Sequence, residues 1–289
     1  MTDTAIATGN DDAIEAWNTI LFDKFVRFRH LLTQGLSAHG EAALGWHPPR
    51  RGARAIDLGC GFGDTTMPIA GLVGPGGDAL GVDCSARFVD SARADAAAAG
   101  IANVRFEVRD IEADALGGPY DYAFSRFGIM FCANPVAALR NVRASTEPDG
   151  ELCCVVWRKR DDNPWVFVAQ QVVERFVPKG DHAEHVTCGP GPFSMASADL
   201  VSEQFRIAGW RRVAFERHDA PICIGRDIDE AVQFALAIGP SGEHMRLAGA
   251  AGQACLGEVV PALEAMFRGH LGSDGVMLPS STWVVTARA

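Results

Sequence analysis

The sequence lacks the patterns that place a chain in a membrane, on nucleic acid or outside the cell. Its 289 residues contain no apolar stretch that approaches the roughly 20 residues of a membrane-spanning helix. It has no run or stripe of Lys and Arg, and its formal net charge is −10, so nucleic acid and anionic membranes are not expected partners. The polar, acidic segment 1–12 is unlike a secretory signal. We therefore expect a cytoplasmic protein.

The eight cysteines form neither a metal-binding nor a disulfide pattern. No two of them are spaced as C-x-x-C, and most lie in apolar runs. A zinc site needs clustered ligands, whereas buried free thiols are ordinary in a reducing compartment. We expect these side chains to be small buried hydrophobes, and we predict no metal site.

The most informative stretch is residues 57–63, which read Asp-Leu-Gly-Cys-Gly-Phe-Gly. The apolar run Arg54–Leu58 predicts a short buried strand, and apolar residues at helical spacing follow the glycines. We expect Asp64 or Thr65 to cap that helix, with Pro68 in its first turn. Strand, glycine turn and helix form a nucleotide-cradling unit, because glycine permits positive φ and lets a ligand lie against bare backbone.

Asp64 bears on which nucleotide this unit holds. A dinucleotide-binding loop has a third glycine at this position, and a carboxylate there would face a pyrophosphate. The same carboxylate would not repel a positively charged ligand. Gly59-x-Gly61-x-Gly63, preceded by Asp57, resembles motif I of the class I S-adenosylmethionine (SAM) methyltransferases, whose cofactor carries a sulfonium and an ammonium group.

Two further predicted strands lead to carboxylates. The strand Ala79–Asp83 ends about 20 residues beyond the loop, where an acid reaches the ribose hydroxyls of a bound nucleotide. The alternative is a helix cap by Asp83, although Ser85 already fills that role. The strand Asn103–Val108 is followed by Asp110, which is either a solvated loop residue or, as in the methyltransferases, an acceptor for the adenine amino group.

The next segments complete the resemblance. The strand Tyr120–Ser125 leads into residues 126–131, which read Arg-Phe-Gly-Ile-Met-Phe, and a Pro-Asp-Gly turn at 148–150 precedes the strand Leu152–Trp157. Over Arg54–Arg158 this order is similar to the UbiE-type branch of the class I methyltransferases. The resemblance implies SAM as the cofactor, with adenine between Phe88 and Ile111. The cofactor contacts that we expect are Asp57, Gly59, Gly61, Gly63, Asp83, Cys84, Phe88, Asp110, Ile111, Ser125, Trp17 and Arg29.

The segment before the first strand predicts one amphipathic helix from Asp12 to Leu32. It either packs on the sheet or caps the cofactor, with Trp17, Asn18 and Arg29 at its inner edge. A tryptophan beside an asparagine on an apolar face is costly to bury without a partner, so both interpretations stay open.

Beyond Arg158 the resemblance loosens. We expect a sixth strand at Arg211–Arg217 and a last strand at Thr282–Ala287, whose pairing resembles the antiparallel seventh strand of the family. The intervening segment is helical by pattern at 228–238 and 254–268 and is too long for a hairpin turn. It predicts a lid over the carboxyl ends of the strands.

These elements predict a doubly wound, Rossmann-like α/β fold. We expect a seven-stranded sheet, mostly parallel with an antiparallel last strand, an N-terminal helical cap and a helical insertion before the last strand. The expected boundaries are 1–53 for the cap, 54–218 for the SAM-binding core, 219–281 for the lid and 282–289 for the final strand.

Methyl transfer from a sulfonium is an in-line displacement, in which the protein mainly supplies proximity and alignment, worth roughly 7–11 kcal/mol. A general base is needed only if the acceptor is protonated. His185 and His244 are the leading candidate bases and His182 and His218 the weaker ones, although each is more often a structural or surface residue. The residues that we expect in an acceptor pocket, most of which are otherwise ordinary core, are Asn18, Phe127, Met130, Phe131, Trp165, Phe193 and Met245.

Three functions stay open. The first is a SAM-dependent methyltransferase that acts on O, N or C of a small, apolar or aromatic metabolite. The second is an NAD-dependent oxidoreductase, against which Asp64 and Asp110 argue. The third is a SAM-binding regulator or scaffold without transferase activity, although a large lid favours an enclosed reaction site. No sequence feature points to a particular oligomeric state.

Overall fold

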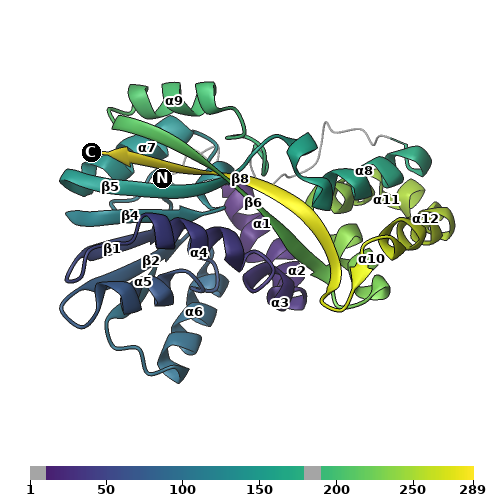
Figure 1. Ribbon diagram of the computed structural model, residues 1–289, viewed down its shortest axis with the longest axis horizontal. Coiled ribbons are helices and arrows are strands. Elements are labelled where there is room, and N and C mark those ends of the chain that lie inside the picture. Colours follow the sequence, from purple (N-terminus) through teal and green to yellow (C-terminus); the bar gives the residue numbers. More distant parts are fainter. Residues whose placement is uncertain (1–10, 179–189) are drawn as a thin grey trace, which may run out of the picture.

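The computed structural model describes residues 11–178 and 190–289, which form a twisted sheet flanked by helices with a helical bundle at one end (Figure 1). The sheet has the order β3-β2-β1-β4-β5-β8-β6, with the short β7 paired to β8. Pairing is parallel from β3 to β5, and β8 is antiparallel to both β5 and β6. The predicted doubly wound fold with one antiparallel strand is confirmed. The strands are β1 (Arg54–Leu58), β2 (Asp78–Asp83), β3 (Val104–Val108), β4 (Tyr120–Arg126), β5 (Thr146–Trp157), β6 (Arg211–Gly225), β7 (Leu271–Gly272) and β8 (Gly275–Arg288).

Alternate residues of the central strands point to opposite faces of the sheet and are buried in two separate apolar layers. Because both faces are buried, these strands are continuous apolar runs in the sequence. One layer packs Ile56, Leu58, Ala123 and Leu152 under α7 (Pro135–Ala144) and α9 (Ala198–Ile207). The other packs Ala55, Phe124, Cys153 and Val155 under α4 (Ser37–Trp46) and α5 (Thr66–Val73). A smaller cluster joins Phe106 of β3 to α6 (Ala86–Ala98).

The prediction of a single helix before the first strand is wrong. The chain forms α1 (Asp11–Asn18), α2 (Ile20–Arg27) and α3 (Arg29–Thr33), separated at Thr19 and Phe28, which leave the helical region of φ and ψ. The Thr19 hydroxyl donates to the Glu15 carbonyl at 2.7 Å, a side-chain bond that competes with the helical ladder. These breaks contain no Gly or Pro, so helical spacing did not reveal them. The helix α4, also not predicted, fills most of the region before the link to β1.

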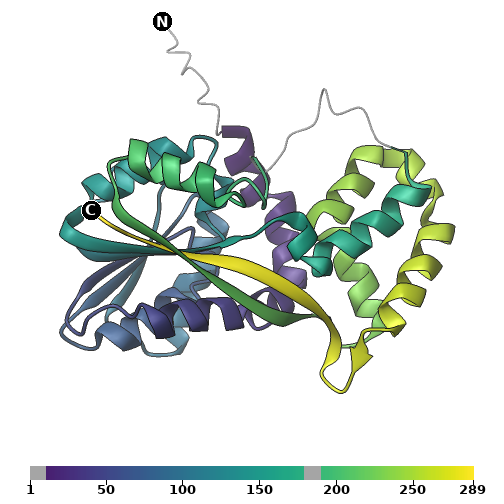
Figure 2. The ribbon, with the colours of Figure 1, turned by 45° about the horizontal axis from the view of Figure 1, so that its top comes forward.

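The sixth and last strands are longer than predicted. β6 continues from Arg217 to Gly225, and β8 begins at Gly275 rather than Thr282. Their antiparallel pairing runs out to Gly225 and Val276, carrying both strands beyond the core (Figure 2). The extensions bury alternate apolar residues, Ile222, Ile224, Val276 and Leu278. The predicted boundaries 219 and 281 therefore fall inside strands.

Four helices form the lid at the far end of these strands (Figure 2). They are α8 (Pro164–Phe176), α10 (Ile228–Ala237), α11 (Gly239–Ala254) and α12 (Leu256–Arg268). Helix α11 was not predicted, because its glycines interrupt the pattern and Gly249 breaks its helical geometry with φ of +53°. Helix α8 follows β5, so the lid is built from two separated segments of the chain. Within the described residues, no helix is long and apolar enough to cross a membrane.

Asn163 ties the base of α8 to the sheet. Its side chain is fully buried, and its amide donates to the carbonyls of Lys159 at 3.0 Å and Ser281 at 3.1 Å. Its Oδ1 accepts from the Ser281 N–H at 2.9 Å. This two-way bond to Ser281 fixes the start of the lid against β8.

We predict that Asn163→Ala lowers the free energy of unfolding by about 2–3 kcal/mol. The buried Ser281 N–H loses its partner, while the carbonyls of Ser281 and Lys159 each lose one of two donors. Denaturant unfolding followed by circular dichroism measures this loss. Asn134→Ala is the control, since it removes an exposed cap of α7 and is expected to cost only about 1 kcal/mol. Equal losses in the two variants would contradict the role given to Asn163.

Candidate active site

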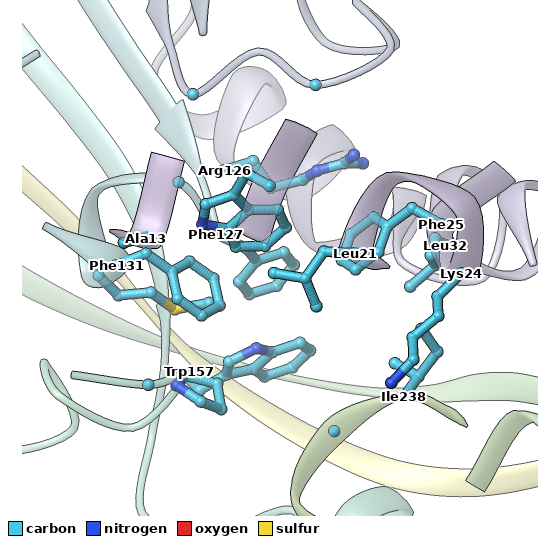
Figure 3. Close-up of a pocket in the computed structure, with 18 of the residues that line it drawn as sticks. Ala13, Leu21, Lys24, Phe25, Leu32, Arg126, Phe127, Phe131, Trp157 and Ile238 are labelled. Atoms are coloured by element: carbon cyan, nitrogen blue, oxygen red, sulfur yellow. The ribbon is translucent and has the colours of Figure 1, made fainter. Parts of the chain in front are cut away.

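A cavity of about 750 Å³ lies where the carboxyl ends of the parallel strands meet the N-terminal helices and the lid. Its size is typical of a ligand site, and the carboxyl edge of a doubly wound sheet is where such folds bind ligands. Figure 3 shows its middle, with Leu21 and Phe25 of α2, Phe127 after β4, Trp157 of β5 and Ile238 of the lid around the open space.

The glycine loop forms the core side of this cavity. Gly59, Gly61 and Gly63 all have positive φ, of +69°, +53° and +78°. A Cβ on Gly59 would lie 2.8 Å from the Cα of Gly128, whereas one on Gly61 would meet nothing within 4 Å. Gly59 is thus needed for a close backbone contact, and Gly61 leaves bare backbone beside the cavity.

Four amides of this loop are engaged inside the protein. The N–H groups of Gly59 and Cys60 donate to the Val82 carbonyl at 2.8 and 3.0 Å, and that of Gly63 donates to the Cys60 carbonyl at 2.9 Å. The Gly61 N–H donates to Asp83 Oδ2 at 2.9 Å. A phosphate-binding loop instead points such groups at the anion. These four amides are therefore not available to a pyrophosphate, and the loop is compatible with a nucleoside that carries no phosphate.

Asp57 lies behind the loop and does not line the cavity, contrary to its prediction as a cofactor contact. Its Oδ2 accepts from the hydroxyls of Thr65 and Thr66, both at 2.7 Å, while its Oδ1 is buried and has no partner among the described residues. Thr65 therefore holds Asp57 and makes no side-chain cap for α5. Burial raises the pKa of Asp57 to about 6, against the opposing effects of the two hydroxyls and Arg126.

Asp64 lines the cavity but forms an ion pair with Arg126, whose side chain is only 11% exposed. The pair carries no net charge, so the argument that Asp64 alone would repel a pyrophosphate is wrong. The argument against a pyrophosphate rests instead on the loop amides that are already hydrogen-bonded inside the protein. Gly40 of α4 leaves room for this arginine, because a Cβ there would lie 3.0 Å from Arg126 Cδ.

Asp83 ends β2 beside the loop and lines the cavity. Its Oδ1 accepts from the Ser85 N–H and its Oδ2 from the Gly61 N–H, both at 2.9 Å. Ser85 makes no side-chain cap for α6, so Asp83 fixes the start of that helix as well as the loop. Burial raises the pKa of Asp83, and these two backbone bonds oppose that shift. Each carboxylate oxygen retains a lone pair for a ligand.

An aromatic cluster borders the same end of the cavity. Phe88 of α6 is buried, with its ring centroid 4.8 Å from that of Phe62 and 6.4 Å from that of Trp17. Trp17 also packs edge-on against Phe131 at 5.1 Å. Of the predicted cofactor contacts, those that line the cavity are Gly59, Gly61, Asp83, Cys84, Phe88, Asp110, Ile111 and Trp17.

A stacked aromatic pair lines another part of the cavity. The rings of Phe127 and Trp157 lie 4.0 Å apart at an angle of 11°, and Trp165 lies 5.1 Å beyond Trp157. Phe127 has φ of +58°, a conformation that bulky residues rarely adopt. Buried His39 packs edge-on against both stacked rings, and burial lowers its pKa to about 3, so it is neutral. The predicted acceptor residues that line the cavity are Phe127, Met130, Phe131, Trp165 and Phe193.

Other predicted site residues lie elsewhere. Arg29 pairs with Asp95 and covers Phe62, because the break between α2 and α3 turns it outward. The Asn18 Nδ2 donates to the Ile14 carbonyl, and the Asn18 Oδ1 accepts from the Ser85 hydroxyl. The residues that do not line the cavity are Asp57, Gly63, Ser125, Arg29, Asn18 and Met245. Ser125 is buried and clamps the backbone, donating to the Leu58 carbonyl and accepting from the Ile129 N–H.

Of the two predicted bases that the structure describes, His244 lines the cavity. Its Nε2 lies 3.0 Å from the Val177 carbonyl, which accepts but does not donate, so Nε2 carries the proton. In the neutral ring, Nδ1 is then a bare acceptor. His218 lies outside the cavity, with its Nδ1 2.8 Å from that of His39. His182 and His185 lie outside the described residues.

Sequence reasoning missed several lining residues. Trp157 ends a strand whose carboxyl edge borders the site, so position along the sheet was an available signal. No sequence feature indicated the other missed residues, because their positions depend on how the N-terminal helices and the lid fold over the core. They are Leu21, Lys24, Gln170 and Ile238. Among the residues that the structure describes, no group of three or more His, Cys, Asp or Glu side chains is placed to hold a metal ion.

Comparison with known proteins identifies the core. Residues 49–186 match the family model described as a methyltransferase domain. This match covers just under half of the chain and supports a class I SAM-dependent methyltransferase domain. The predicted family resemblance is thereby confirmed, and SAM is the cofactor of this family.

The relatives share this domain and differ in what they act on. A ubiquinone biosynthesis O-methyltransferase of Cereibacter sphaeroides is 30% identical over 158 residues, which cover 52% of this chain and 60% of that protein. A 23S rRNA (uracil-C(5))-methyltransferase of Shewanella is 33% identical over 111 residues, covering 38% of this chain and 23% of that one. The structure of Haemonchus contortus phosphoethanolamine N-methyltransferase 2 in complex with SAM superposes with a TM-score of 0.55 at 15% identity, covering 96% of this chain and 59% of that one.

We predict that Asp57→Asn changes how stability depends on pH. The folded-state pKa of Asp57, about 6, lies above its ordinary value of 3.8, so folding favours the protonated form. The wild type therefore loses free energy of unfolding as pH rises from 3.8 through 6, by about 3 kcal/mol. The asparagine side chain of the variant does not titrate. The difference in free energy of unfolding between the two proteins should therefore shift in favour of the variant over this pH range.

Denaturant unfolding at a series of pH values from about 4 to 7 measures the effect. Asp90→Asn is the control, because Asp90 is an exposed residue of α6. Its stability profile should run parallel to that of the wild type. A parallel profile for Asp57→Asn as well would contradict the prediction.

Proposed function

We propose that this chain is a methyltransferase that moves the methyl group of SAM to O, N or C of a small, mainly apolar or aromatic acceptor. The observation that carries the proposal is one cavity that joins the glycine loop to the stacked pair Phe127–Trp157 beneath the lid. The O-methyltransferase name of the Cereibacter relative supports a hydroxyl acceptor.

The cofactor end of the cavity fits SAM. Asp83 offers two carboxylate oxygens to the ribose hydroxyls, and Asp110 offers an acceptor to the adenine amino group between Phe88 and Ile111. Bound SAM supplies an activated methyl group. Four of the loop amides are already hydrogen-bonded inside the protein, so they are not free to bind a pyrophosphate, and Gly61 leaves room for a nucleoside. This argument also disfavours an NAD-dependent oxidoreductase.

The acceptor end supplies alignment and exclusion of water. The stacked rings of Phe127 and Trp157 provide a flat apolar wall, which holds a planar acceptor in one orientation. A mainly apolar cavity suits a small molecule better than RNA, and the net charge of −10 agrees with this. The alternative function, a SAM-binding regulator or scaffold, has the same cofactor end but no need for such a wall.

We predict that S-adenosylhomocysteine (SAH) binds the wild type tightly and binds Asp83→Asn at least tenfold more weakly. The loss of hydrogen bonds between the carboxylate and the ribose should be worth roughly 1.5–3 kcal/mol. Calorimetric titration measures both, with NAD as a second ligand that should give no signal. Asp90→Asn should bind SAH like the wild type. NAD binding, or SAH affinity indifferent to Asp83, would contradict the cofactor assignment.

We propose His244 as the general base for a hydroxyl acceptor and predict that His244→Gln slows methyl transfer by about 10²–10⁴-fold. Glutamine can still donate to the Val177 carbonyl, but it lacks a basic nitrogen. Release of SAH from SAM, with catechol as the test acceptor, measures the rate. SAH affinity should stay unchanged, which separates a chemical defect from a structural one. An unchanged rate would exclude His244 as the base.

A further inference from the structure

Two buried polar atoms on α8 have no hydrogen-bond partner among the described residues. They are the indole Nε1 of Trp165 and the amide Oε1 of Gln170, and both residues line the cavity. Trp165 is only 7% exposed, so water does not reach it freely. Buried polar groups are nearly always hydrogen-bonded, so a pair of exceptions in one cavity wall calls for a partner that arrives from outside the chain.

The chemistry of Glu174 fixes which way the Gln170 amide faces. The Gln170 Nε2 lies 2.6 Å from Glu174 Oε1, and an ionised carboxylate only accepts hydrogen bonds. The amide nitrogen must therefore face Glu174, because the opposite orientation would set two oxygens against each other. This leaves Oε1 as an acceptor without a donor. A ligand that satisfies it must carry a hydroxyl or an N–H group.

Trp165 supplies the complementary role beside the aromatic wall. An indole N–H only donates, so its partner must be an oxygen or a bare nitrogen. The Trp165 ring lies 5.1 Å from Trp157, which stacks on Phe127. Phe127 precedes Gly128, the residue in backbone contact with Gly59 of the glycine loop. The rings of Trp157 and Phe127 thus separate the Trp165 N–H from the turn at Gly128, which borders the cofactor end of the cavity.

We propose that α8 recognises the polar edge of the methyl acceptor, with Gln170 Oε1 accepting from it and Trp165 Nε1 donating to it. The acceptor is then a planar ring that carries both a hydrogen-bond donor and a hydrogen-bond acceptor, such as a hydroxylated aromatic ring. This inference rests on the proposed function and narrows its substrate class. A site built to bond a hydroxyl rejects an analogue without one, because its own groups then stay unpaired.

The test uses the intact chain saturated with SAH and three probes of similar shape. Catechol donates and accepts, 1,2-dimethoxybenzene only accepts, and o-xylene does neither. Calorimetry should rank them in that order for the wild type, with roughly tenfold weaker binding for each kind of bond lost. Gln170→Leu should abolish the preference for catechol over 1,2-dimethoxybenzene. Trp165→Phe should abolish the preference for 1,2-dimethoxybenzene over o-xylene.

The neighbouring residue offers a matched control. Gln171 has the same side chain on the same helix but is exposed and does not line the cavity, so Gln171→Leu should keep the wild-type ranking. SAH affinity should be unchanged in all three variants, which shows that each is folded.

Equal binding of the three probes to the wild type, or an unaltered ranking in Gln170→Leu, would overturn the inference while leaving the proposed function intact. Failure of the wild type to bind SAH would instead overturn the proposed function, and the inference with it.

Discussion

The backbone contact between Gly59 and Gly128 sets the geometry on which the rest of the site depends. A Cβ on Gly128 would lie 2.6 Å from the Leu58 carbonyl oxygen, so only two glycines let the turn after β4 reach the loop after β1. Ser125 clamps the same turn through the Leu58 carbonyl and the Ile129 N–H. The contact places Phe127 in its positive-φ conformation and stacks it on Trp157. One close approach therefore joins the cofactor end to the acceptor wall.

Arg126 balances the charge around this contact. It pairs with Asp64 at the cavity, and its charge also lowers the pKa of buried Asp57 and of His39. The loop region thus holds the carboxylates of Asp57 and Asp64 beside one arginine, which offsets part of their negative charge. Because Asp64 is neutralised, selection of the ligand passes to hydrogen bonding. The engaged loop amides disfavour an anion, and Asp83 retains lone pairs for hydroxyl groups. Charge complementarity to the sulfonium is not what distinguishes this site.

Local pattern was sufficient to predict the core, since strands such as Arg54–Leu58 are continuous apolar runs and their ends place Asp83 and Asp110 at one edge. It failed where tertiary contacts decide the outcome. The break at Thr19 comes from a side-chain bond within a sequence that looks helical, and a second break at Phe28 directly precedes Arg29, which pairs with Asp95. The true length of β6 depends on pairing with β8, some 60 residues away in the sequence. No sequence feature indicated Gln170, because whether its amide oxygen is hydrogen-bonded depends on the residues that surround it in the fold.

The lid is better described as an extension of the sheet than as a hinged flap. β6 and β8 keep their pairing from the core out to Gly225 and Val276, and Asn163 bonds the start of α8 to both backbone groups of Ser281. Movement of the lid as a unit would break these buried bonds, which is costly. The cavity is therefore largely preformed. In a preformed site, selectivity comes from the fixed polar atoms that line it, because closure contributes little. The atoms of Trp165 and Gln170 that have no partner among the described residues sit on the lid helix that Asn163 anchors. The bonds that hold the lid therefore also hold the groups that we propose recognise the acceptor.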